Sequence, residues 1–94
     1  MPIEDDSRIA VAFRTLHKRP LHGLRHPAHG NIAGWYIRGG EFSTEVDFFQ
    51  VLHAKHLAED YPQLMHYLAL EPGFRFLTHD DYSDVWFDEQ LLTV

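Results

Sequence analysis

The stretch that decides the fold is DFFQVLHAKHLAED, residues 47–60, which we expect to form one amphipathic helix. At 3.6 residues per turn, its apolar side chains share one broad face, which predicts the side that packs in the core: Val51, Ala54, Leu57, Ala58 and Tyr61. Thr44 or Asp47 is placed to cap the start. Pro62 ends the helix, because proline disfavours helical geometry in the residue before it.

The composition predicts a single domain over residues 1–94, loop-rich from 17 to 33. An apolar fraction of 45% and an aromatic fraction of 14% are typical of globular chains. The absence of cysteine excludes a disulfide framework, a thiolate nucleophile and a cysteine-based zinc site. The acidic N-terminus and the lack of a long apolar run argue against a signal peptide or membrane span, so we expect a cytoplasmic protein.

The formal charge of −6 is divided unevenly along the chain. Residues 1–40 carry six Lys and Arg against three acids, whereas residues 41–94 carry two against eleven. An acidic C-terminal half repels nucleic acid and steers basic protein partners toward it, and we expect neither nucleic acid nor a membrane as a partner. A merely well-solvated acidic surface is the alternative.

The N-terminal third has ambiguous patterning. Residues 7–16 fit either a strand or a helix, and we favour the helix. Residues 17–31 contain two prolines and two glycines, which predicts a loop or an irregular edge strand.

The rest of the chain predicts two strand-rich regions around the helices. Residues 34–38 form a strand closed by a Gly-Gly turn, and residues 63–70 form a short helix with Pro62 as its first residue. Residues 74–78 and 84–88 form an antiparallel hairpin. We therefore expect an α+β fold in which two helices cover one face of a three- or four-stranded, mainly antiparallel sheet.

The last strand presents an unusual tryptophan. If Val85 and Phe87 face the helices, then Trp86 stands on the outer face between Asp84 and Asp88. A tryptophan flanked by carboxylates is typical of an interface anchor, because tryptophan dominates binding hot spots and charge governs encounter.

A structural role for Trp86 is the alternative. In that case its ring packs across the sheet onto Trp35 or Leu77, since aromatic residues in small sheets are mostly scaffold.

The eight histidines raise the possibility of a metal site. On a helix, His53, His56 and Asp60 converge on one side, and three loop histidines could add ligands: His22, His26 and His29. The common helical zinc pattern spaces its histidines four apart around a glutamate, which this chain lacks. The alternative is structural: His56 pairs with Asp60, and His53 bonds to a neighbouring loop.

Other catalytic patterns are weak, so we expect no enzyme and no cofactor. The serines have no nucleophile context, no glycine loop is suited to phosphate, and Asp80 and Asp81 are adjacent acids typical of a solvated turn.

Three ordered blocks of sequence resemble a known family: GWYIRGGEFSTEVDFFQVLHAKHL at 34–57, YLALEPGFRFL at 67–77 and DVWFDEQLL at 84–92. The family is that of immunity proteins of polymorphic toxin systems, the group numbered thirty-three, also catalogued as a bacterial domain of unknown function. The likeness spans about Gly34 to Leu92, and residues 1–33 have no evident counterpart. Where the family often has Asp-Ser-Gly before the tryptophan, this chain has Ile32-Ala33-Gly34, so it resembles a divergent member.

The resemblance implies a protein that binds and neutralises a toxin made by its own cell, such as a nuclease or another basic effector. An acidic surface with exposed aromatic residues suits that task, and we expect it to comprise Asp80, Asp81, Tyr82, Asp84, Trp86 and Asp88, with Glu41 and Glu45 nearby. Two other functions remain open: a metal-dependent enzyme or metal-binding module using His53, His56 and Asp60, and a general protein-interaction domain.

Overall fold

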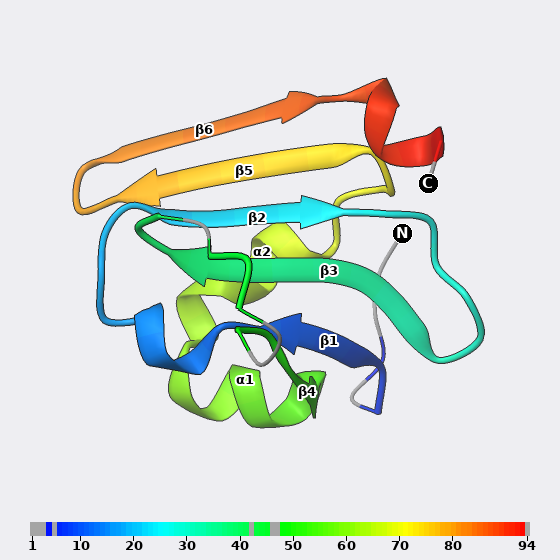
Figure 1. The fold of residues 1–94 in the computed structure, drawn as a ribbon, viewed down its shortest axis with the longest axis horizontal. Helices are drawn as coiled ribbons and strands as arrows, with labels where there is room; N and C mark the ends of the chain where they lie inside the picture. The colour runs from blue at the N-terminus through cyan, green and yellow to red at the C-terminus, as the bar shows by residue number, and fades with distance from the viewer. Residues whose placement is uncertain (1–3, 5, 42, 46–47, 94) are drawn as a thin grey trace.

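The chain folds into a six-stranded mixed sheet with helices on one face (Figure 1). The computed structural model describes residues 4, 6–41, 43–45 and 48–93. The strands are β1 Arg8–Val11, β2 Leu21–Arg25, β3 Ile32–Gly39, β4 Gln50–His53, β5 Phe74–His79 and β6 Tyr82–Phe87. Their order is β4-β1-β3-β2-β5-β6, and all neighbours are antiparallel except β1 and β3. The α+β class is confirmed, but the expected sheet of three or four strands is too small.

Two helices pack on one face of the sheet: α1 Ala54–Asp60, and α2 Met65–Leu68, which continues the 3-10 turn η2 Pro62–Leu64 (Figure 1). Two more 3-10 turns, η1 Phe13–Thr15 and η3 Glu89–Thr93, follow β1 and β6. In the described part of the chain no helix has the length and apolarity needed to cross a membrane.

The core lies between the sheet and these helices. The indole Nε1 of Trp35 donates a hydrogen bond of 3.0 Å to the carbonyl of Leu68, which fixes α2 on β3. The ring of Tyr67 stacks on Phe76 with 4.4 Å between centroids, so α2 is also fixed on β5. Arg25 is buried there too, and its Nε and Nη1 donate to the carbonyls of Ala33 and Leu70 at 2.8 and 2.7 Å.

The predicted helix over residues 47–60 is correct only from Ala54 onward. Gln50–His53 is a strand, because its backbone pairs with β1 along its whole length. Val51 is consequently 69% exposed and does not belong to the core, whereas Leu57 is buried as expected. The predicted end before Pro62 is confirmed.

The predicted caps do not start the helix. Thr44 lies outside any helix, Asp47 lies outside the described residues, and the residue before α1 is His53, which makes no side-chain capping bond.

The N-terminal third differs most from the prediction. The favoured helix at 7–16 is wrong, since β1 and η1 occupy that region. The predicted loop or edge strand at 17–31 contains β2, an internal strand between β3 and β5. Gly23 allows this, because a Cβ at that position would collide with the ring of Phe76 on β5. Because Gly23 has no side chain, the ring of Phe76 packs directly over the backbone in the middle of the sheet.

The C-terminal expectations agree better. β3 includes the predicted strand 34–38, and β5 and β6 form the predicted hairpin, although its turn is shorter than expected. The predicted helix 63–70 begins at the proline but ends at Leu68 and divides into η2 and α2.

Candidate protein-binding surface

The β5–β6 hairpin carries most of the predicted binding residues. β6 is one of the two edge strands of the sheet, and all six of its residues are exposed. Val85 lies opposite Phe76 and Phe87 opposite Phe74, so both point to the helix face as expected. They remain 41% and 52% exposed. The contact of α2 with β6 is between the Tyr67 hydroxyl and Ser83, nearer the start of the strand. β6 therefore presents apolar side chains to solvent on both of its faces.

Trp86 stands on the face of the sheet that the helices leave open. It lies opposite Arg75 and is 39% exposed. Packing of Trp86 onto Trp35 is excluded, because Trp35 is buried on the helix face. Leu77, the other candidate neighbour, lies on the open face opposite Asp84. The predicted exposure of the tryptophan beside Asp84 is thus correct.

Asp80 and Asp81 form the tight turn of the hairpin, between the paired residues His79 and Tyr82. The Asp80 carboxylate is well solvated, and its backbone N–H donates to His79 Nδ1 at 2.9 Å. Tyr82 is exposed next to both acids. An aromatic ring and two carboxylates therefore project from one end of the hairpin.

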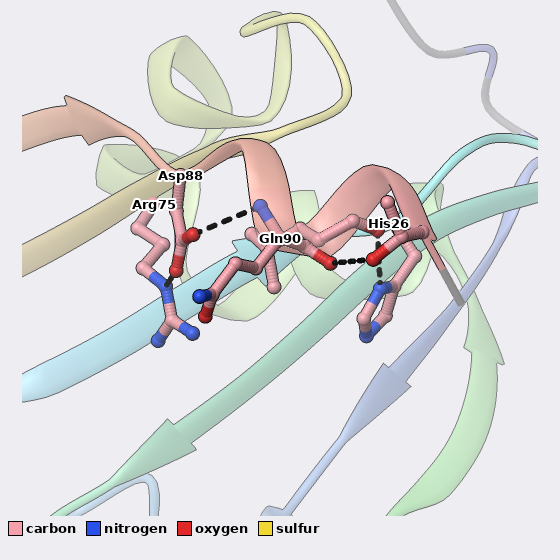
Figure 2. A network of polar contacts seen from close by, with 6 residues as sticks. His26, Arg75, Asp88 and Gln90 are labelled. Carbon is pink, nitrogen blue, oxygen red and sulfur yellow. Dashed lines mark hydrogen bonds and ion pairs between the residues drawn. The ribbon is translucent and has the colours of Figure 1, made fainter.

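Asp88 has a different role from Asp84. Arg75 Nε donates to one of its carboxylate oxygens at 2.9 Å, and the backbone N–H of Gln90 donates to the other at 3.1 Å (Figure 2). The following turn, η3, is held in place by a 3.0 Å contact between the Leu91 carbonyl and His26 Nδ1. The Asp88 carboxylate is thus bound by groups of the protein itself, whereas Asp84 forms no ion pair among the described residues.

The two predicted glutamates lie in the β3–β4 loop. Glu41 is exposed just beyond the end of β3. Leu21 pairs with both Gly39, at the end of β3, and Thr78, near the end of β5. The end of β3 and the hairpin turn therefore lie at the same end of the strands (Figure 1). Glu45 approaches Arg14 at 3.9 Å, and both side chains are exposed, so this pair contributes little to stability.

A basic cluster on the open face was not found from the sequence. His22 on β2 lies opposite Arg38 on β3 and Leu77 on β5, with Arg75 nearby. Burial, and then the charges of Arg38 and Arg75, lower the pKa of His22, and burial together with Arg75 lowers the pKa of Arg38. Positive charge therefore lies on the open face beside the hairpin. Only the strand register could reveal this cluster, and the sequence predicted a loop or an irregular edge strand here, not an internal strand.

The candidate metal ligands do not form a site. His53 ends β4, and its ring stacks on His56 with 6.2 Å between centroids. Across the described ranges, no three His, Cys, Asp or Glu side chains gather as metal ligands would. The proposed His56–Asp60 pair is also absent from the ion pairs of the described residues. This geometry gives no support to a metal-dependent function.

Comparison with known proteins gives one match. The family model of the Imm33-like domain matches residues 1–88. It includes residues 1–33, for which the sequence suggested no counterpart, and it ends before Leu92. No curated protein and no solved structure matches the chain.

Proposed function

Because the chain belongs to the Imm33-like domain family, we propose that it is an immunity protein, which binds a toxin of its own cell and blocks it by stoichiometric contact. The protein acts without catalysis and needs no cofactor. It works in the cytoplasm, where the toxin would otherwise reach its target. The family match over residues 1–88 is the observation that carries this proposal.

The β5–β6 hairpin is the proposed contact surface. Tyr82 and Trp86 supply large, rigid contact area beside the carboxylates of Asp80, Asp81 and Asp84. Buried aromatic anchors dominate binding free energy, and peripheral charges accelerate encounter with a partner of opposite charge. A basic partner, such as a nuclease domain whose active site binds phosphate, fits this surface. Nucleic acid and membranes do not, because the same carboxylates repel phosphate.

The remaining predicted residues take lesser roles in this proposal. Glu41 adds a further carboxylate at the end of the strands where the hairpin turn lies, and Glu45 is a more distant neighbour. Asp88 acts indirectly, because its bonds to Arg75 and Gln90 hold the end of β6 in place.

The test is co-expression with the product of the neighbouring toxin-like gene. We expect the wild-type chain to rescue growth and to copurify with that product. Trp86→Ala should weaken binding by about 2 kcal/mol or more, as loss of a central aromatic anchor does. Val51→Ala is the matched control, since Val51 is exposed on β4 at the opposite edge of the sheet.

The outcomes separate the candidate functions. Copurification without growth rescue would favour a general interaction domain over immunity. Equal effects of Trp86→Ala and Val51→Ala would remove the hairpin from the contact surface while leaving the immunity function intact.

A further inference from the structure

We propose that the free edge of β6 accepts an extended basic segment of the partner protein, which pairs with it as an additional strand. The partner's identity as a toxin rests on the proposed function above. The mode of contact rests on the geometry of the hairpin alone.

The pairing of β6 with β5 shows which backbone N–H and C=O groups of β6 are left unpaired. Among the described strands, β6 pairs only with β5. The N–H of Asp88 donates to the Gly73 carbonyl at 2.7 Å, so Asp88 points inward to β5. Inward and outward residues alternate along an antiparallel strand. Ser83, Val85 and Phe87 therefore direct their N–H and C=O groups to the free edge.

This edge has few of the features that usually protect a sheet. Natural edge strands are short, bulged, charged, or interrupted by proline. Asp84 is the one charged residue within β6, and it disfavours pairing with another acidic strand more than pairing with a basic one. β6 has six residues, a continuous register with β5, and neither proline nor lysine. The opposite edge strand, β4, has only four residues and runs directly into α1. β6 is thus the edge suited to strand addition.

The side chains of β6 define the chemistry of the added strand. On the helix face, Val85 and Phe87 offer apolar contact to residues paired with them. On the open face, Asp84 favours a Lys or Arg in the facing residue, and the exposed face of Trp86 accepts a second cation. The best partner segment therefore alternates apolar and basic residues.

Charge complementarity selects a foreign strand over a second copy of this chain. Pairing β6 with its own copy would bring two sets of Asp80, Asp81 and Asp84 to one interface. Two acidic hairpins at one interface repel each other, whereas a basic segment neutralises the carboxylates.

The first experiment measures amide exchange in the isolated protein with a synthetic hexapeptide of alternating lysine and valine. Strand addition should protect the amides of Ser83, Val85 and Phe87, while those of Asp84 and Trp86, already bonded to β5, change little. Two control peptides carry glutamate in place of lysine, or N-methyl groups on the amides that would face β6. Each should bind about tenfold more weakly or worse, because one loses the charge match and the other the backbone bonds.

Two results would overturn strand addition. One is equal binding of the N-methylated peptide, which would reduce the contact to charge attraction. The other is protection that does not alternate along β6.

The second experiment uses the toxin-like gene product. Val85→Pro removes an outward N–H, which an edge strand tolerates, and Val85→Ala keeps it. We expect Val85→Pro to lose at least about tenfold more affinity than Val85→Ala, with circular dichroism confirming the fold of both. Equal affinities would overturn strand addition while leaving immunity intact. If the wild-type protein does not bind the toxin at all, the proposed function fails. The peptide experiment then still tests whether β6 accepts an additional strand.

Discussion

The Nε atom of Arg75 lies 2.9 Å from a carboxylate oxygen of Asp88, so a side chain of β5 holds the point at which β6 ends. Both side chains are partly buried, which limits screening by solvent. We expect a coupling of about 1 kcal/mol between them, typical of a charge-assisted hydrogen bond near the surface. A double-mutant cycle with Arg75→Gln and Asp88→Asn, followed by urea unfolding, measures this coupling. Additive effects would show that the pair does not stabilise the fold.

Leu57→Ala should destabilise the protein by about 2 to 5 kcal/mol, because it leaves a cavity beneath α1. Leu57 is 1% exposed, whereas Val51, on the preceding strand, is 69% exposed. Val51→Ala should therefore change the free energy of unfolding by less than about 0.5 kcal/mol. Thermal unfolding of both variants tests the separation of β4 from α1. If residues 51–57 formed one continuous helix with Val51 in the core, Leu57→Ala and Val51→Ala would lower the free energy of unfolding by similar amounts.

Gly23→Ala should cost about 1 to 3 kcal/mol, because the new methyl group meets the ring of Phe76. Phe76→Leu removes ring atoms at the point of collision. The double variant should then lose less stability than the sum of the two single variants, as measured by denaturant unfolding. A full sum would mean that β2 and β5 do not make this close approach.

His22 should make the protein less stable in mild acid. Its pKa in the folded protein is lowered from 6.5, first by burial and then by Arg38 and Arg75. At pH values just below 6.5, the unfolded chain binds more protons at His22 than the folded protein does. The contribution of His22 to stability is therefore fully present above pH 6.5 and is lost as the pH falls from 6.5 toward the lowered pKa of the folded protein. His22→Gln removes this contribution. Unfolding of both proteins at about pH 7.5 and about pH 5.5 should show a smaller pH dependence in the variant.

If the proposed toxin is the partner, Asp84→Lys should slow association with it by roughly 2- to 10-fold at low salt and weaken the salt dependence of the rate. Glu59→Lys makes the same change of charge on an exposed position of α1, which directly follows β4, the edge strand opposite β6. It serves as the matched control in stopped-flow or surface-binding kinetics. Similar rates for the two variants would assign the effect to net charge and not to the hairpin.

The hairpin was predictable because its signals are local. Aromatic and β-branched residues alternate on either side of an acidic turn, and the exposure of Trp86 beside Asp84 follows from that alternation. The resemblance to the immunity family likewise depends on contiguous blocks of sequence, and the family match confirms it.

The errors concern strands that depend on distant partners. Residues 50–53 have helical periodicity together with the segment that follows them, but hydrogen bonds to β1 make them a strand. β2 has prolines before and after it and a glycine at its centre, which are typical of a loop, and only β3 and β5 stabilise it. The basic cluster around His22 was missed for the same reason.

The pairing of Leu21 with Thr78 joins an early part of the chain to a late one. While the ribosome is still making the protein, β2 has β3 beside it and nothing on its other side until residues 74–79 are added. A product released before that point would leave the middle of the sheet open and would lack the aromatic ring that covers Gly23. Premature termination should therefore yield material that quality-control proteases remove, and not a partly folded fragment.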